Sequence, residues 1–399
     1  MVNSRMHWIS ARGERLSHRF LWRVFIAVAL AFCGISLALA QTTREQAQRI
    51  HDRIAGVPPS DTVLTQMMAR SPLDAALMAT NDTHFYTVTL KNLAAPWTNR
   101  DQSVFVPLND YITLVIGMVR DNWPFDQILY GDLLYVDPNV SPGVSASSNA
   151  HFEALEQRFL DPDFDVSELS QTTQSSVYPF PAEAAAGAIT TRAAAEAFFI
   201  AGTNRAMFRF TLINHMCMDM EQVLDTSVTP DQIRQDVSRS PGGDSRVFMN
   251  NCIGCHAGMD PLARAFAYYN YDTTSERLVY TPGVVQSKYF NNNKTFPDGF
   301  VTPDDSWSNH WRQGQNALIG WSSALPGSGQ GAKSLGQELA ATQAFAQCQV
   351  KKVFKSVCLR DPVDQADRDQ VNTMTTTFEN NNYNLRQVFA ESAGYCMGN

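Results

Sequence analysis

One pentapeptide, Cys252-Ile253-Gly254-Cys255-His256, constrains this chain more than any other feature of its sequence. A c-type haem needs two thiols at a spacing that reaches both vinyl groups of one porphyrin, and an adjacent imidazole that reaches the iron from the same side. The spacing C-x-x-C-H meets that geometric requirement in five residues. The sequence therefore predicts one haem c, bound covalently through Cys252 and Cys255, with His256 as the proximal iron ligand.

Two other uses of a C-x-x-C pair stay open as alternatives. A zinc site needs two more ligands at a comparable spacing, and the chain has no second C-x-x-C pair and no H-x3-H pair. A redox dithiol is expected where a helix begins after a strand in a βαβ unit, whereas the surroundings here are predicted to be helical. Both arguments favour the haem.

The first 40 residues differ in character from the rest of the chain. Five arginines precede an uncharged, apolar run over residues 24–40, "VFIAVALAFCGISLALA", which ends in Ala38-Leu39-Ala40. This order is typical of a secretory signal peptide, so residues 1–40 are predicted to be one and the mature protein to be periplasmic, extracellular or on the cell surface. An uncleaved membrane anchor is the alternative, and contact with a membrane is expected only in that case.

The charge of the mature chain limits its partners. Cleavage after Ala40 leaves 26 basic and 38 acidic residues, a formal charge of −12 against −8 for the precursor. An acidic surface argues against nucleic acid and against anionic membranes. If charge guides docking, we expect a cationic redox partner protein.

Four cysteines of the mature chain lie outside the motif: Cys217, Cys348, Cys358 and Cys396. In an oxidising compartment they could form two disulfides, with three connectivities that the sequence does not rank. If residues 348–358 form one helix, Cys348 and Cys358 are roughly 15 Å apart along its axis and cannot bond to each other. Each would then need Cys217 or Cys396, or stay free.

The patterns along the chain predict a mainly α fold. An N-terminal helical domain is expected at 41–225, because residues 112, 115, 116 and 119 are apolar at the spacing of one helix face and Pro124 then breaks or restarts the helix. An alanine-rich stretch from Pro181 predicts one or two long buried helices.

The remaining chain divides in two. Residues 226–332 are predicted to form a haem c-binding domain, with a long ordered loop and a hairpin after Asp272, where Pro, Gly and Asn mix with short β-type runs. Residues 333–399 are predicted to form a C-terminal module of three short antiparallel helices.

The residues around the pentapeptide resemble known haem proteins. Phe248 lies four residues before Cys252, and "RVFMNNCIGCH" resembles the Val-Phe-x-x-x-Cys-x-x-Cys-His entry helix of class I cytochromes c. That resemblance implies that Phe248 packs over the haem attachment site. A plain core position for this ring is equally compatible with the pattern.

A second resemblance follows the motif. "CIGCHAGMDPLARAFAYYNYD" is similar to the haem-bearing segment C-x-x-C-H-x-x-x-D-P-[IL]-G of a family of exported proteins of unknown function, abundant in planctomycetes and myxobacteria. Asp260, Pro261 and Leu262 match, and Ala263 stands where that family has glycine. The helical tail is also similar to that family's C-terminal module. The resemblance implies an exported monohaem cytochrome.

Two functional interpretations differ in whether the iron has a distal ligand. An electron carrier usually closes this position with Met or His, whereas an open position permits ligand binding or peroxide chemistry. His310 and Met374 are the candidates, although a surface histidine and a core methionine explain them as well. His215, Met216, Met218 and Met220 form a further cluster.

The sequence therefore predicts an exported monohaem c-type cytochrome that transfers single electrons and is more a carrier than a catalyst. A haem enzyme of peroxidase or oxygenase type with an open distal site is the first alternative. A surface-binding protein with an accessory haem module is the second.

Overall fold

The computed structural model describes residues 41–200 and 202–397, and this part of the chain is mainly α-helical, as predicted. The predicted signal segment, residues 1–40, lies outside the described residues. The α-helices of the first half are α2 (Arg44–Ala55), α3 (Asp61–Met68), α4 (Pro72–Ala79), α5 (Lys91–Ala94), α6 (Asp110–Arg120), α7 (Ala150–Arg158), α8 (Gln174–Val177), α9 (Arg192–Phe198) and α10 (Arg205–Met216). Those of the second half are α11 (Ser245–Val247), α12 (Ile253–Ala263), α13 (Gly331–Ala340), α14 (Gln343–Cys358), α15 (Gln365–Asn380) and α16 (Leu385–Met397).

The strands are short and form three separate antiparallel pairs in the described residues. The pairs are β1 (Leu134–Val136) with β2 (Ser170–Thr172), β3 (Tyr269–Asp272) with β4 (Arg277–Tyr280), and β5 (Ser306–Ser308) with β6 (Ser328–Gln330). The β3–β4 pair supplies the hairpin that was expected next to Asp272. The segment from there to α13 otherwise consists of turns, short 3-10 helices and the strands β5 and β6, as expected for a long ordered loop.

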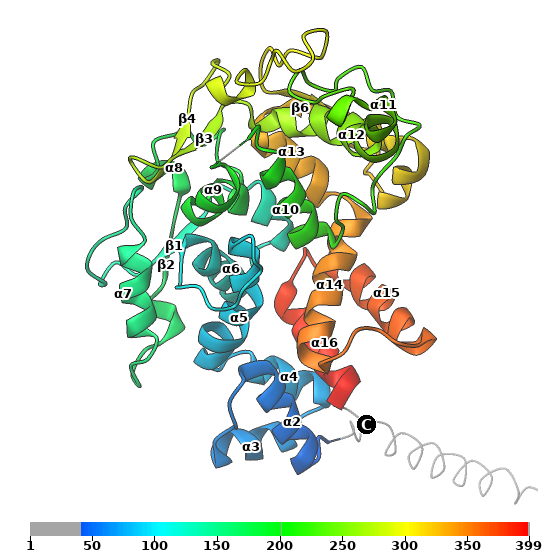
Figure 1. Ribbon diagram of the computed structural model, residues 1–399. Helices are drawn as coiled ribbons and strands as arrows, with labels where there is room; N and C mark the ends of the chain where they lie inside the picture. The colour runs from blue at the N-terminus through cyan, green and yellow to red at the C-terminus, as the bar shows by residue number, and fades with distance from the viewer. Residues whose placement is uncertain (1–40, 201, 398–399) are drawn as a thin grey trace, which may run out of the picture.

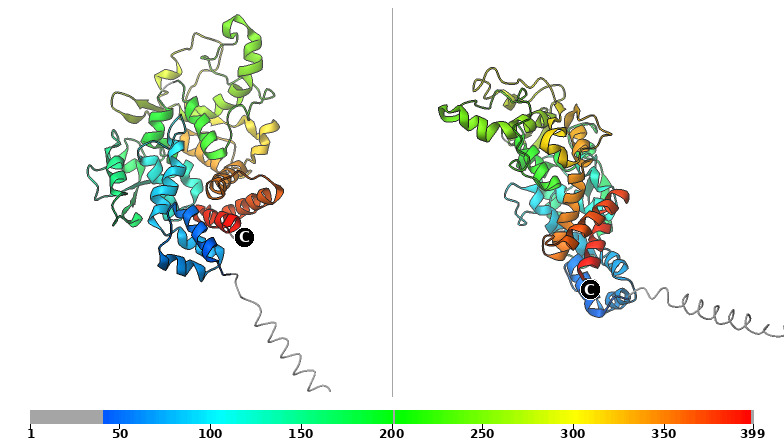
Figure 2. Two further views of the ribbon diagram at one scale, coloured as in Figure 1. Left: turned by 60° about the horizontal axis from the view of Figure 1, so that its bottom comes forward. Right: turned by 90° about the vertical axis from the view of Figure 1, so that its right-hand side faces the viewer.

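A chain of helix–helix contacts runs along the molecule from the N-terminal helices to α12. At the end drawn lowest in Figure 1, α2 and α4 pack against α16, so the N-terminal and C-terminal helices lie side by side, as both views of Figure 2 also show. Helix α14 packs against α16, α15 and α10, and α10 in turn packs against α12. The helix that carries the pentapeptide therefore lies at the far end from α2 and α4.

Helix α6 shows how local sequence fixes an element. Asn109 caps it, because its side-chain oxygen accepts a hydrogen bond from the Ile112 amide (3.1 Å), and the chain restarts after Pro124 as a 3-10 turn, η3 (Phe125–Leu129). The sequence predicted one buried face, but every residue from Asp110 to Val119 is buried. The difference arises because neighbours cover this helix on all sides, including α5, α9 and β1.

The alanine-rich stretch does not form the long helices that its composition predicted. It is divided into the 3-10 turn η5 (Gly187–Thr190) and the helices α9 and α10. Thr191 starts α9 as an N-cap, and Asn204 has a φ of 60°, which ends any continuous helix before α10. Capping residues outweigh alanine's helix propensity here.

The C-terminal part contains four helices rather than the predicted three. The first expected helix is two, α13 and α14, because Thr342 accepts a hydrogen bond from the Phe345 amide (3.1 Å) and begins a new helix. The expectation that Cys348 and Cys358 share one helix and do not bond to each other is confirmed. Cys217 bonds to Cys348 and Cys358 bonds to Cys396, with Cα–Cα distances of 5.3 and 5.6 Å.

One large apolar cluster runs through the described residues, besides a small cluster of Ala267, Tyr268 and Tyr289. The large cluster joins Leu114 of α6, Phe266 near the motif and Phe389 of α16, so residues from all three predicted parts contribute to one core. The division at 225 and 332 into separate domains stays a prediction.

Candidate functional site

The pentapeptide lies where α11, a π-helical turn and α12 follow one another at the upper edge of Figure 1. The π turn, η7, spans Phe248–Cys252, and α12 begins at Ile253. Cys252 is three residues before Cys255 and four before His256, so the three side chains lie on the same face of the helix. All three are partly exposed, and both thiols are free.

The side chain of Phe248 is buried. Its ring is 6% exposed and lies under the guanidinium of Arg239, 4.8 Å from the ring centroid, and Arg239 also covers Phe296 at 4.3 Å. The Ile253 amide donates to the Phe248 carbonyl, five residues back, so the turn before the motif is wider than the α-helical turn that the sequence predicted. Packing of Phe248 on a haem stays a prediction.

The imidazole of His256 is held on one nitrogen and open on the other. Its Nδ1 lies 3.1 Å from Oδ1 of Asp260, one helical turn later, and its side chain is 21% exposed. The structure shows no hydrogen bond from Nε2 to any described residue. Because an ionised carboxylate only accepts hydrogen bonds, the contact places the proton on Nδ1 and leaves the Nε2 lone pair available.

A buried charge network lies behind His256. Asp260, 0% exposed, accepts hydrogen bonds from Arg205 through Nε (2.7 Å) and Nη2 (3.0 Å) and from the Arg234 backbone amide (3.2 Å). Arg205 also binds Asp236 through two hydrogen bonds of 2.6 and 2.9 Å. Burial by itself would raise the pKa of Asp260, but the charges of Arg205 and Arg234 and the bond to His256 hold that pKa well below its usual range. The sequence pointed to Asp260 only as part of a resemblance, because two of its partners, Arg205 and Arg234, come from distant segments.

The opposite face of α12 packs closely on two loops through Gly254 and Gly258. A Cβ added to Gly258 would lie 1.8 Å from the indole nitrogen of Trp311, and one added to Gly254 would lie 2.8 Å from Leu224. Sequence reasoning missed both glycines, although their spacing of four within a helix was a usable signal of close packing.

His310 belongs to the segment whose next residue, Trp311, packs against Gly258. It begins the 3-10 turn η10 (His310–Arg312), directly before Trp311, and its Nε2 is 3.3 Å from Gln232 Nε2 and from Ser308 Oγ. Gly258 and His256 are two residues apart, roughly 200° around the helix. The role of His310 as a distal ligand stays a prediction.

The other candidate ligands lie in the core. Met374, 0% exposed, belongs to α15, where its sulfur accepts a hydrogen bond from Ser392 of α16 (3.5 Å). His215 is buried, with Nε2 2.6 Å from the Tyr111 hydroxyl. Met220, by contrast, belongs to a segment that passes the motif, since its carbonyl oxygen lies 3.6 Å from the Cys255 sulfur.

The motif residues fit a covalently bound haem. Among residues 41–200 and 202–397 the two thiols are unpaired while the other four cysteines form two disulfides, and the hydrogen bond of the His256 ring to Asp260 leaves Nε2 open. Burial raises the pKa of the Cys255 thiol, with smaller contributions from Cys252, Glu221 and Asp219. In the part of the chain that the structure describes, no group of three or more His, Cys, Asp or Glu side chains is arranged to hold a metal ion.

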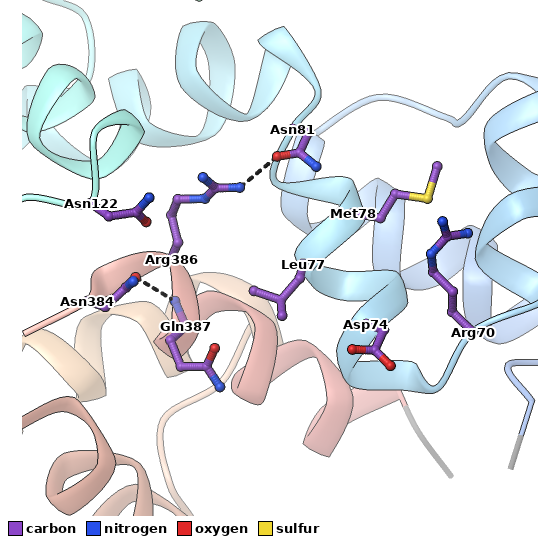
Figure 3. A pocket seen from close by; sticks show the side chains of 9 residues that line it. All are labelled: Arg70, Asp74, Leu77, Met78, Asn81, Asn122, Asn384, Arg386 and Gln387. Atoms are coloured by element: carbon purple, nitrogen blue, oxygen red, sulfur yellow. Dashed lines mark hydrogen bonds between the residues drawn. The ribbon is translucent and has the colours of Figure 1, made fainter. Parts of the chain in front are cut away.

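A solvent-open pocket of about 600 Å³ lies at the other end of the molecule, between α4 and the start of α16 (Figure 3). Arg386 donates to Asn81 across it (2.7 Å), and Arg70 and Asp74 line its rim. None of the motif residues contributes to this pocket.

Comparison with family models, with curated proteins and with solved structures found no match to this chain. None of the helices in residues 41–200 and 202–397 combines the length and the apolar character that a membrane span requires.

Proposed function

We propose that this chain is an exported monohaem c-type cytochrome that transfers single electrons in the periplasm or at the cell surface. One observation carries the proposal: Cys252, Cys255 and His256 share one partly exposed face, with both thiols free and one imidazole nitrogen open. Haem c would supply a one-electron iron couple at this face.

Each side chain of the site would have its own role. Cys252 and Cys255 would hold the group covalently, and His256 would bind iron through Nε2. Asp219 and Glu221 lie close enough to Cys255 to act on its pKa, so acidic groups border the site. Such a border suits a cationic redox partner, which charge attraction would guide to the site.

The attachment is tested by changing both cysteines, Cys252→Ala and Cys255→Ala, in the exported full-length chain. Covalent haem, measured as haem that stays with the chain after denaturation, should be lost. The control Cys358→Ala with Cys396→Ala removes two cysteines that bond to each other and should keep the haem. Haem that stayed attached without Cys252 and Cys255 would refute the proposal.

A second candidate is a haem protein with an open distal position. The position of Met374 favours it, because this predicted ligand is buried between α15 and α16, where it accepts a hydrogen bond from Ser392. The absorption spectrum of the reduced protein with and without carbon monoxide separates the two candidates. An unchanged low-spin spectrum supports the carrier, whereas rapid carbon monoxide binding supports the open site.

A further inference from the structure

The contact between His256 and Asp260 has a consequence for the iron that His256 would bind. Asp260 is fully buried and receives four hydrogen bonds: from His256 Nδ1 (3.1 Å), from Arg205 Nε (2.7 Å) and Nη2 (3.0 Å), and from the Arg234 amide (3.2 Å). We propose that Asp260 is a positioning residue that fixes the tautomer and raises the basicity of His256, so that a haem bound there favours its oxidised state. This inference rests on the proposed function.

The acceptor of the Nδ1 hydrogen bond affects how strongly His256 would bind iron. A histidine that donates its second ring N–H to a carboxylate is a more basic metal ligand than one that donates to water or to a backbone carbonyl. A more basic imidazole gives more electron density to iron and stabilises the higher charge, Fe(III), over Fe(II). On one-electron reduction the iron gains the electron and the proton stays on Nδ1.

The surrounding network keeps the carboxylate in place and ionised. Asp260 and Asp236 carry two negative charges, and Arg205 and Arg234 carry two positive ones, so the buried cluster is neutral overall. Oδ1 of Asp260 is shared between His256 Nδ1 and Arg205 Nε, which means that Arg205 limits how strongly the carboxylate binds the imidazole. Variants of Arg205 and Asp260 are therefore expected to act in opposite directions.

The first variant is Asp260→Asn in the haem-loaded, full-length protein. The amide keeps the shape but is a weaker acceptor, and second-shell partners of this kind typically alter metal binding by about 10–100-fold. The preference for ferric over ferrous iron should fall by about the same factor, which at 59 mV for each tenfold change is a rise in midpoint potential of about 60–120 mV. If the distal position is open, the iron–histidine stretching frequency should also fall, measured by resonance Raman on the ferrous protein; if it is closed, the midpoint potential is the measured quantity.

Two further variants control for charge and for folding. Asp236→Asn removes the same charge next to the same Arg205 but does not touch His256, so the iron–histidine frequency should stay unchanged. Arg205→Lys keeps the positive charge but loses the paired hydrogen bonds from Nε and Nη2 to Asp260. The iron–histidine frequency should therefore rise and the midpoint potential should fall. This second variant tests the inference even if Asp260→Asn does not fold.

The outcomes separate the inference from the proposed function. If the unmodified protein carries no covalent haem, the proposed function fails and the inference fails with it. If haem is bound and Asp260→Asn leaves both frequency and potential unchanged, or Asp236→Asn lowers the frequency equally, then only the role of Asp260 is refuted.

Discussion

Gly258 is the residue at which α12 is most sensitive to a single methyl group. A Cβ there would lie 1.8 Å from the indole nitrogen of Trp311, a side chain that is 0% exposed, so the indole or the helix must move. Gly258→Ala should lower the free energy of unfolding by about 1–3 kcal/mol, the usual cost of overpacking. Urea unfolding followed by circular dichroism measures it.

Gly394 of α16 supplies the matched control, because it is also a helical glycine and the nearest atom to an added Cβ is 3.9 Å away. Gly394→Ala should raise the free energy of unfolding by up to about 1 kcal/mol through helix propensity. Equal effects of the two substitutions would contradict the packing argument.

His51 and Asp82 form a pair whose stabilising effect depends on pH. His51 Nε2 lies 3.3 Å from Asp82, and Nδ1 lies 2.8 Å from the Val57 carbonyl. Burial by itself would lower the pKa of His51, but these bonds raise it above 6.5, and the bond to His51 is the main reason that the pKa of Asp82 is lowered below 3.8. The contribution of His51 is thus complete below pH 6.5 and is lost as pH rises through its folded pKa, while that of Asp82 is lost as pH falls below 3.8.

The free energy that Asp82→Asn removes should therefore be larger at about pH 5.5 than at about pH 8.5, by on the order of 1 kcal/mol. Denaturant unfolding of both proteins at both pH values measures this difference. A loss that is the same at the two pH values would show that His51 is not charged in the folded state.

Two disulfides join helices that are distant in sequence. Cys217, which ends α10, bonds to Cys348 in α14 across 131 residues, and Cys358, which ends α14, bonds to Cys396 in α16 across 38 residues. Helix α14 is thereby bonded to α10 at Cys348, inside the helix, and to α16 at its last residue, Cys358.

Removing each bond as a double alanine variant should destabilise the protein by about 2–4 kcal/mol, and more for the 131-residue loop, since a cross-link restricts the unfolded chain more when the loop is longer. Urea midpoints of the haem-free chain measure this. Cys252→Ala with Cys255→Ala is the control and should change the midpoint little, because these thiols are unpaired. Equal losses for the two bonds would argue against a loop-entropy origin.

At the scale of the whole molecule, the net charge should affect the rate at which a redox partner associates. Residues 41–399 carry a formal charge of −12, and Glu221 and Asp219 lie near Cys255. A small basic redox protein used as a probe should exchange electrons with the haem-loaded chain more slowly as salt rises. Between about 0.01 and 0.5 M salt we expect at least a tenfold fall in the second-order rate constant, measured by stopped-flow absorbance. A rate that was independent of salt would contradict electrostatic guidance.

The sequence by itself determined what depends on short spacings. The apolar repeat at residues 112, 115, 116 and 119 predicted α6, and the helical geometry of 348–358 excluded one disulfide pairing. Short-range patterns failed where a local cap competed with propensity, as at Thr191 and Thr342, which divide helices that composition alone would continue.

Only the tertiary structure decided which distant groups meet. The partners of Asp260 come from α10, from the segment around 234 and from α12 itself, and Trp311 packs against Gly258 although 53 residues separate them in the chain. The physical reason is that such contacts depend on how whole helices pack, which no spacing within one segment records. The spacing of the motif predicts a haem, and the packing of α10 against α12 decided which groups surround Asp260 and His256.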